Sequence, residues 1–389
     1  MSNSIPGARR PGALRADALP FPLGVAAGGE RSQRRGPGPA RETVMCAHEK
    51  ASDRRSSCEA RSSRLRRASR GVGSILLLVT SMLFAACAKD SITKPGTYLA
   101  SCLTAQFPPD NVWNQQIGSL SVDPRSQTWV ASFFPPSQGF SIATAPGCGL
   151  PVIRTGPARQ RMRFDLQAES DDCLYPFSNS QPFEACNPDS HWAAIDTVNC
   201  ILYEMYNVHA GAQNYAAQGS RWFLTSNDLR PNGWTSADEA GLPISPGLLN
   251  YDEAHSGTIR HALRFALSWP DVDTSYVWPA RHFGRRDPLP NAIPFGMRMR
   301  LKANYVIPPG CSPECAAVLT ALRDYGAFLA DRASVPSGNF ALECQLDPRW
   351  GGIPSEINLA TRGISVSLEF VDESAYMADP NSGRWKPPF

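Results

Sequence analysis

The chain of 389 residues lacks the short motifs by which common enzyme classes are recognised. It contains no G-x-S-x-G, no G-x-x-x-x-G-K-[ST], no H-E-x-x-H and no G-x-G-x-x-G after a strand pattern. These absences remove the usual signatures of serine hydrolases, P-loop nucleotidases, zinc peptidases and dinucleotide-dependent enzymes. No pair of histidines with a third ligand nearby has the spacing of a transition-metal site, so no metal centre is predicted.

A basic surplus, which nucleic-acid binding would require, is also missing from most of the chain. The whole sequence carries 38 Lys and Arg against 35 Asp and Glu, a formal net charge of +3. Residues 1–86 hold 15 of the basic and 6 of the acidic residues, which leaves 23 basic against 29 acidic residues, a net charge of −6, in the remainder. We therefore expect no nucleic-acid partner.

The apolar run Ser74–Ala86, thirteen uncharged residues, is too short to span a membrane as a helix. Five arginines precede it: Arg61, Arg64, Arg66, Arg67 and Arg70. A basic segment followed by an apolar segment and small residues is typical of a signal peptide. The end of the run, Phe84-Ala85-Ala86-Cys87, resembles the lipobox of bacterial lipoproteins, which implies lipidation of Cys87. Phe84 departs from the usual Leu, so secretion without a lipid stays an alternative.

These features predict how the chain is organised. Residues 1–60 are expected to be a disordered leader or the product of a mis-assigned start, because they are rich in Arg, Gly, Pro and Ser and have no apolar periodicity. Residues 61–87 are the expected signal peptide with its lipobox, and residues 88–108 a tether. Residues 109–389 are expected to form a single β-rich extracellular domain. The protein is thus expected at the bacterial cell envelope, lipid-anchored or secreted, with membrane contact only through the lipid.

Cysteine usage agrees with export. Of eleven cysteines, Cys46 and Cys58 lie in the leader and Cys87 is the expected lipidation site. The other eight are Cys102, Cys148, Cys173, Cys186, Cys200, Cys311, Cys315 and Cys344. An even number is what a set of disulfides requires in an oxidising compartment. We expect disulfides, and for the Cys311-x-x-x-Cys315 spacing a metal or redox pair is the alternative.

The fold is predicted from short runs in which apolar and polar residues alternate. Such runs lie at residues 162–166, 259–267, 297–305 and 364–370, and residues 191–196 and 200–208 form an expected hairpin. Alternation with one polar side is typical of half-buried antiparallel strands. One helix is expected after Ser312, which can cap it, with Pro313 in its first turn. We predict an all-β fold, a two-sheet β-sandwich or jelly roll with one or two accessory helices.

Carboxylates and a histidine are the candidate catalytic residues. Glu204 lies in the apolar run CILYEMYNVH, where burial would raise its pKa as a general acid requires. Asp252 and Glu253 follow a long loop, residues 225–250, and two carboxylates about 5–10 Å apart perform glycoside hydrolysis. His261 falls on the apolar side of its run. Structural alternatives stay open: an ion pair for Glu204, a solvated loop for Asp252 and Glu253, and a hydrogen-bonded core position for His261.

Aromatic and basic side chains are the candidate ligand contacts. Indole rings have flat apolar faces and a polar N–H, which suit stacking on sugar rings, although most tryptophans of such a fold belong to the core. The expected substrate-binding residues are Trp222, Trp234, Trp278, Arg281, His282 and His191. No cofactor is expected; Glu169, Asp171 and Asp172 could ligate calcium, for which a charged turn is the alternative. The basic stripe at residues 298–302 is expected on a solvated sheet face.

A resemblance is carried by seven strings: DNVWNQQI, HWAAID, LYEMYN, GWTSADEAGLPISPGLLNYDE, HALRF, VWPARH and GMRMRLKANYVI. Together they resemble a recurring pattern in secreted bacterial proteins of unassigned function. The resemblance covers roughly residues 108–375, nearly the whole expected domain. It implies no activity and no catalytic residues.

The sequence leaves three functions open. The first is an endo-acting glycoside hydrolase that acts on a polysaccharide at the cell surface, with Glu204 as general acid and Asp252 or Glu253 as nucleophile or base. The second is a non-catalytic glycan-binding or structural surface lipoprotein. The third is a polysaccharide lyase, in which a Tyr or His base removes the proton beside a uronate carboxylate that Arg281 neutralises.

Overall fold

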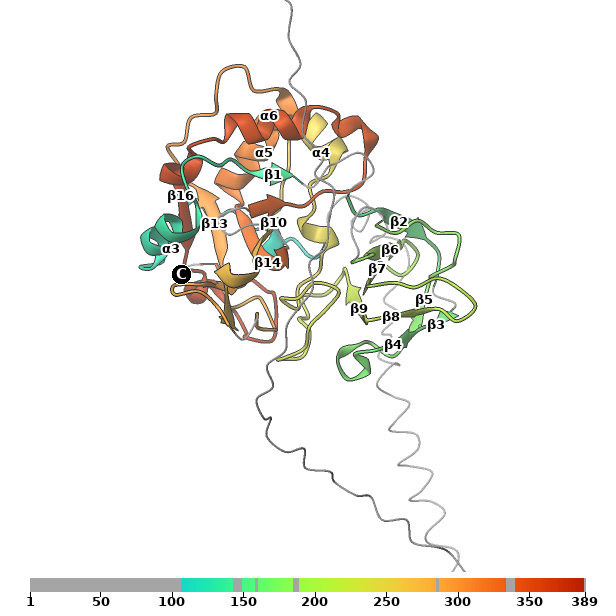
Figure 1. Ribbon diagram of the computed structural model, residues 1–389. Helices are drawn as coiled ribbons and strands as arrows, with labels where there is room; N and C mark the ends of the chain where they lie inside the picture. Colours follow the sequence, from blue (N-terminus) through green and yellow to red (C-terminus); the bar gives the residue numbers. More distant parts are fainter. Residues whose placement is uncertain are drawn as a thin grey trace, which may run out of the picture. The chain divides into compact units, whose positions relative to one another are not determined.

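Two sheets of unequal size dominate the computed structural model, which describes residues 106–142, 149–157, 160–184, 189–284, 287–333 and 340–387 (Figure 1). The expected leader, the signal peptide with Cys87 and all but the last three residues of the expected tether lie outside the described residues. Within that described end of the tether, Phe107 is buried in the main core. The packed domain therefore includes residues before 109.

The larger sheet has six strands in the order β1-β15-β10-β14-β13-β16. They are β1 (Ser141–Ile142), β10 (Leu263–Ser268), β13 (Arg298–Leu301), β14 (Ala327–Ala333), β15 (Phe340–Leu342) and β16 (Leu368–Val371). The sheet is mixed, because β10 pairs in parallel with β14 and antiparallel with β15. Since side chains alternate along a strand, Arg264 and Ala266 of β10 share one face, while Phe265 and Leu267 enter the main core from the other.

The smaller sheet has four strands in the order β2-β6-β7-β9. They are β2 (Val152–Thr155), β6 (Trp192–Asp196), β7 (Ile201–Tyr206) and β9 (Gln218–Phe223). The expected hairpin is confirmed, since β6 and β7 pair antiparallel and Asp196 accepts hydrogen bonds from the N–H groups of Val198 and Asn199 in the turn. Three two-stranded pairs are β3 (Gln160–Arg161) with β5 (Leu174–Tyr175), β4 (Arg163–Phe164) with β8 (Tyr215–Ala216), and β11 (Val272–Tyr276) with β12 (Ile293–Phe295).

Four α-helices occur in the described part of the chain: α3 (Ser126–Phe133), α4 (Tyr251–His255), α5 (Pro313–Asp324) and α6 (Ile353–Ala360). The expected helix is α5, where the Ser312 hydroxyl accepts a hydrogen bond from the Cys315 N–H at 3.2 Å. In Figure 1, α3 lies beside β16 and α6 beside β1, at the two edges of the larger sheet. The strand-rich character is confirmed. A two-sheet sandwich is not confirmed, and the described residues contain four helices where one or two were expected.

The alternating runs overestimate the length of their strands, and the physical reason is visible at three of them. Residues 259–262 precede β10, and the Ala262 N–H donates to a carbonyl oxygen of the N-terminal segment instead of to a neighbouring strand. Residues 364–367 form a 3-10 turn, η7, before β16. Strand β13 ends at Leu301, because the chain then turns with a hydrogen bond from the Tyr305 N–H to the Lys302 carbonyl. Local turn hydrogen bonds thus replace sheet pairing where alternation continues.

The basic stripe is buried, so the expected solvated face is wrong for its two arginines. Arg298 is fully buried, and its guanidinium donates to Glu373 at 2.7 Å and to backbone carbonyls of residues 112 and 115. Arg300 donates to Glu369 at 2.8 Å and to the carbonyl oxygens of residues 117 and 120. A guanidinium carries five N–H donors in a fixed fork, so each arginine satisfies several carbonyl groups at once. Together they fix the N-terminal segment on β13.

One covalent link closes the first turn of α5. Cys311 and Cys315 form a disulfide, which confirms the disulfide prediction for this pair. Glu356 lies close enough to complete a three-residue metal-ligand group with them, but thiolates are the metal ligands and these two sulfurs are bonded to each other.

None of the helices within the described ranges is long and apolar enough to cross a membrane.

Candidate functional site

Two cavities make up the candidate site, and the chain segments that separate them, which we call the wall, contribute side chains to both. Leu150 and Gln345 form a parallel bridge, which joins the segment before β2 to the segment after β15. Side chains of the wall face opposite ways: Ile244 and Cys344 line one cavity, and Ser245 and Gln345 line the other. The long loop that contains Ile244 therefore lines both cavities.

Glu204 fixes this loop. Its carboxylate on β7 is fully buried and accepts hydrogen bonds from the N–H groups of Ser245 at 2.7 Å and Ile244 at 3.0 Å, and from the indole N–H of Trp222 at 3.1 Å. Burial raises the pKa of Glu204, although the hydrogen bonds from the loop oppose it. Glu204 lines neither cavity. Its surroundings suit a residue that positions the wall rather than one that touches a ligand.

Replacing Glu204 with Gln should lower the free energy of unfolding by about 1–3 kcal/mol. The new amide group would turn an N–H toward one of the backbone or indole donors, so a buried donor would lose its acceptor. Urea unfolding of the variant measures the loss. Asp228→Asn, the same loss of charge at an exposed position of the same loop, is the matched control and should stay within about 0.5 kcal/mol of wild type. Equal stability of both variants would contradict the positioning role.

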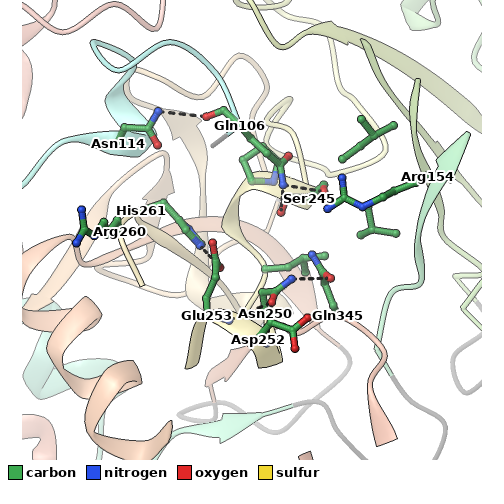
Figure 2. Close-up of a pocket in the computed structure, with 14 residues that line it drawn as sticks. Gln106, Asn114, Arg154, Ser245, Asn250, Asp252, Glu253, Arg260, His261 and Gln345 are labelled. Carbon is green, nitrogen blue, oxygen red and sulfur yellow. Dashed lines mark hydrogen bonds and ion pairs between the residues drawn. The ribbon is translucent and has the colours of Figure 1, made fainter. Parts of the chain in front are cut away.

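The first cavity, about 340 Å³ in volume, brings three of the four expected catalytic residues together (Figure 2). We call it the His261 cavity; its lining includes Asp252, Glu253 and His261. Asp252 pairs with Arg349 at 2.7 Å and keeps 74% of its side chain exposed. Glu253 contacts His261 Nε2 at 3.1 Å. Helix α4 places both carboxylates at the cavity, because Asn250 caps it by accepting hydrogen bonds from the N–H groups of Asp252 and Glu253.

His261 is held between two acceptors. Its Nε2 faces the Glu253 carboxylate at 3.1 Å, and its Nδ1 faces the Ala262 carbonyl oxygen at 2.8 Å. Only the imidazolium donates from both ring nitrogens. Burial lowers the pKa of His261, but the hydrogen bond and charge of Glu253 outweigh burial and raise it. Because both ring nitrogens face acceptors, His261 is better suited to balance the charge of Glu253 than to remove a proton from a ligand.

The three expected tryptophans line neither cavity. Trp222 is buried and donates to Glu204. Trp234 lies against the Arg230 guanidinium, whose central carbon is 5.4 Å from its ring. Trp278 donates its indole N–H to the Ser382 carbonyl oxygen at 2.8 Å. These indole rings hold loops and the C-terminal segment together.

Arg281 and His282 are likewise turned into the protein. The Arg281 guanidinium donates to the carbonyl oxygens of Arg230 and Pro380 and to the Asn381 side chain. His282 Nδ1 contacts the Glu239 carbonyl oxygen at 3.0 Å. Neither residue lines either of the two cavities, so the arginine that motivated the lyase hypothesis belongs to neither.

The three residues considered for calcium are bonded to other protein groups. Glu169 accepts a hydrogen bond from a backbone N–H at 3.0 Å, Asp171 pairs with Arg230 at 2.6 Å, and Asp172 pairs with Arg161. Their carboxylates serve separate partners, which fits the charged-turn interpretation.

The second cavity, about 260 Å³ in volume, lies over the free face of β10 and its two neighbours. We call it the Asp331 cavity; its lining includes Asp331 on β14 and Glu343 just after β15. Its floor consists of three alanines, Ala266, Ala333 and Ala341. Because alanine projects only a methyl group, two carboxylates can stand over the sheet with open space between them.

One buried guanidinium connects the carboxylates of this cavity. Arg264, 1% exposed, contacts Asp238 at 2.7 Å through Nη2 and Glu343 through Nη1. Its distance to Asp331 is longer, 3.9 Å. Asp331 and Glu343 keep 22% and 25% of their side chains exposed, whereas Asp238 is fully buried. Arg264 therefore bonds tightly to Glu343 and only loosely to Asp331.

Because Arg264 contacts them unequally, the two partly exposed carboxyl groups, Asp331 and Glu343, have different electrostatic surroundings. Burial raises the pKa of Asp331, against the opposing attraction of Arg264 and His191. Glu343 is in direct contact with the guanidinium, an interaction that favours the ionised carboxylate. Two carboxyl groups whose surroundings differ in this way are the usual arrangement of an acid and a carboxylate base or nucleophile.

His191, an expected ligand contact, lines the Asp331 cavity beside Glu184 and Asp189. Its Nδ1 contacts Glu184 at 2.7 Å and its Nε2 the Ala237 carbonyl oxygen at 3.2 Å, so it too is bonded as an imidazolium. Burial lowers the pKa of His191, but Glu184 outweighs burial and raises it; burial raises the pKa of Glu184, but His191 outweighs burial and lowers it. The pair bridges the smaller sheet to the long loop.

The contribution of His191 to the free energy of unfolding should decrease as the pH rises above neutral. A folded-state pKa above the unfolded value of 6.5 means that its contribution is fully present below pH 6.5 and is lost as pH rises through the raised pKa. His261 has a shift of the same sign, so the comparison must be between variants. We expect the stability difference between wild type and His191→Gln to shrink from pH 6 to pH 9 in urea unfolding. A difference that grows over this range would contradict the ion pair.

Sequence reasoning missed Asp331, Glu343, Arg264 and Glu184. A signal for the first three exists, because each is a charged residue within or at the end of an otherwise apolar strand: AFLADRA, NFALEC and HALRFAL. Burying a charged side chain without a partner costs free energy, so a charged residue in an apolar strand indicates a buried ion pair or hydrogen-bonded group. Glu184 lies in a loop and carries no comparable signal.

Comparison of the chain with protein-family models, with curated proteins and with solved structures found no match.

Proposed function

We propose that this domain is a glycoside hydrolase that acts on a polysaccharide, with its active site in the Asp331 cavity. The observation that carries the proposal is the pair Asp331 and Glu343, which face one hollow on either side of β10 in different electrostatic surroundings. Glycoside hydrolysis requires two such carboxyl groups, one that donates a proton and one that is ionised. The sequence predicted Glu204 as the general acid and Asp252 or Glu253 as the nucleophile or base; we now propose Asp331 and Glu343 for these roles.

In the proposed reaction Asp331 is the general acid. Burial raises its pKa, which favours the protonated carboxyl group, and that proton passes to the glycosidic oxygen as its bond to the anomeric carbon breaks. Glu343 supplies the carboxylate, either by taking a proton from the attacking water or by adding to the anomeric carbon itself. Arg264 maintains the negative charge of Glu343 and fixes its position. Both carboxyl groups contact one guanidinium, which favours a separation within the 5–10 Å range of glycosidases.

An aromatic ring beside the cavity supports a sugar ligand. Trp269 is 43% exposed, and the guanidinium carbon of Arg332, which lines the cavity, lies 4.7 Å from its ring centre. An exposed indole next to paired carboxyl groups offers the apolar surface on which a sugar ring packs. Trp269 takes the part that sequence analysis gave to Trp222, Trp234 and Trp278.

The proposal places the enzyme outside the cytosol. The disulfide between Cys311 and Cys315 supports an oxidising compartment, and the signal-peptide pattern with Cys87 supports attachment to the cell envelope.

A second candidate is a non-catalytic glycan-binding protein. It is favoured by the ion pairs of Arg264, because groups joined in a network also serve simply to stabilise a fold. Under this alternative the Asp331 cavity would bind sugar without cleaving it.

Incubation of the purified protein with a panel of neutral and acidic polysaccharides tests the proposal. We expect release of new reducing ends from at least one substrate, and none from the same substrate with Asp331→Asn prepared in parallel, which controls for contaminating enzymes. Affinity electrophoresis in gels that contain the same polysaccharides separates the alternatives. Retarded migration without any product would favour the glycan-binding protein and overturn the hydrolase.

A further inference from the structure

The Asp331 cavity is too small to hold a polysaccharide. Its volume of about 260 Å³ lies below the usual range of small-molecule sites, about 300–1,000 Å³, and suits about one or two sugar rings. A polysaccharide cleaved by Asp331 and Glu343 must therefore continue over the protein surface beside the cavity. Exposed aromatic rings at the edge of the cavity indicate where it lies, because the C–H faces of sugars pack on such rings.

Exposed aromatic rings are rare in this protein. Of the Phe, Trp and Tyr side chains within the described residues, only Trp269 and Phe283 are exposed, each by 43%. Trp269 begins η5 (Trp269–Asp271), directly after β10, and Phe283 follows His282 in the loop between β11 and β12. The two rings come from different segments of the chain, and a row of contacts joins both of them to the Asp331 cavity.

Arg332 is the residue at which the cavity meets this row. It lines the cavity from β14, and its guanidinium carbon lies 4.7 Å from the centre of the Trp269 ring. Its Nε pairs with the Glu239 carboxylate, so its charge is balanced within the protein. The guanidinium therefore acts as a fixed support for the indole ring and not as a charge offered to a ligand.

The contacts continue from Glu239 to the second exposed ring. The Glu239 carbonyl oxygen accepts a hydrogen bond from His282 Nδ1 at 3.0 Å. The His282 ring in turn stacks on Phe283, with the ring centres 4.5 Å apart and the planes inclined by 24°. The row thus ends in an exposed aromatic ring on either side of the Arg332–Glu239 ion pair.

His282 adds a hydrogen-bond acceptor between the two rings. Burial lowers the pKa of His282, although the hydrogen bond to Glu239 opposes it, and the lowered pKa favours the neutral imidazole. Because a carbonyl oxygen only accepts, Nδ1 carries the proton and Nε2 is then an acceptor. Nε2 has no hydrogen-bond partner in the part of the chain that the structure describes. It can therefore accept a hydrogen bond from a hydroxyl group of a ligand.

We propose that Trp269, Arg332, His282 and Phe283, which we call the Trp269 surface, bind the sugar units of a polysaccharide that extend beyond the Asp331 cavity. The two exposed rings pack on the C–H faces of sugars, and His282 accepts a hydrogen bond from a hydroxyl group. The surface rests on the proposed function, because it takes a polysaccharide as the ligand of that cavity. A short oligosaccharide fills the cavity without reaching Phe283, so the length of the substrate decides how much of the surface is used.

Hydrolysis of oligosaccharides of increasing length by the full chain tests the surface, with the series taken from the polysaccharide that the wild-type protein cleaves. We expect kcat/KM to rise at least about tenfold from the trimer to the octamer, because contacts away from the cleaved bond also lower the barrier. Phe283→Ala should reduce the octamer-to-trimer ratio of kcat/KM by about 3- to 10-fold. Leu359→Ala, which truncates an exposed apolar side chain on α6 that lines neither cavity, should leave the ratio unchanged.

An octamer-to-trimer ratio in Phe283→Ala equal to that in Leu359→Ala would overturn the proposal. Affinity electrophoresis separates this failure from a failure of the proposed function. If the wild-type protein cleaves no polysaccharide but is retarded by one, the surface holds when Phe283→Ala and Trp269→Ala lose the retardation and Leu359→Ala keeps it. Unchanged retardation in both ring variants would overturn the surface. Absence of any polysaccharide that is cleaved or bound would overturn the surface and the proposed function together.

Discussion

Asp331→Asn should lower kcat for polysaccharide hydrolysis by about 10²- to 10⁴-fold, with KM changed by no more than about threefold. Asparagine has the shape of aspartic acid and preserves packing over the alanine floor, but its amide cannot give a proton to a leaving oxygen. The substitution should therefore slow the chemical step and leave substrate binding nearly unchanged. Initial rates at several substrate concentrations separate kcat from KM.

The pH profile distinguishes a proton donor from a residue that only supports the cavity. An acid must be protonated to act, so wild-type activity should fall as pH rises through the raised pKa of Asp331. Asp331→Asn should lose that alkaline limb and show residual activity that is flat in the same range. Asp172→Asn, at an exposed ion pair, is the control and should retain the wild-type profile. An Asp331→Asn enzyme with wild-type kcat would remove this residue from the mechanism.

Local elements of the fold were predictable because their signals are local. The cap at Ser312 and the turn between β6 and β7 follow from side chains that bond to backbone N–H groups two or three residues away. The arrangement of the sheets was not predictable in this way. The parallel pairing of β10 with β14 joins segments about sixty residues apart, and alternation alone does not reveal which neighbour a strand takes.

The candidate site illustrates the same limit. Asp252, Glu253 and His261 were expected together, and α4 with its Asn250 cap does bring them to one cavity. Glu204 was correctly read as buried, yet it bonds to the loop instead of facing a ligand. The alternation of apolar and polar residues does not reveal whether another chain segment packs on the polar face of a strand. The arginines of β10 and β13 stand on faces that look solvated in sequence and are covered by other segments of the chain.

Arg264→Met should cost about 3–5 kcal/mol of unfolding free energy, the largest stability effect that we expect from a single substitution here. The guanidinium is 1% exposed and contacts the fully buried Asp238 carboxylate at 2.7 Å. Methionine fills a similar volume but provides no positive charge, so the buried Asp238 carboxyl group would lose the guanidinium that opposes the effect of burial on its pKa. Urea unfolding with an unchanged m-value would attribute the loss to stability and not to a changed denatured state.

A double substitution separates the charge effect from packing. Since replacing both members of a buried pair with apolar residues is often nearly neutral, Arg264→Met with Asp238→Leu should recover a substantial part of the loss. The recovery stays incomplete, because Asp238 also accepts a hydrogen bond from the Ala240 N–H at 2.9 Å and Glu343 loses its partner. Arg161→Met at the exposed pair with Asp172 is the matched control and should cost about 0–1 kcal/mol. An Arg264→Met protein as stable as this control would mean that the carboxylates of the Asp331 cavity do not depend on the guanidinium, and the electrostatic difference between Asp331 and Glu343 would lose its cause.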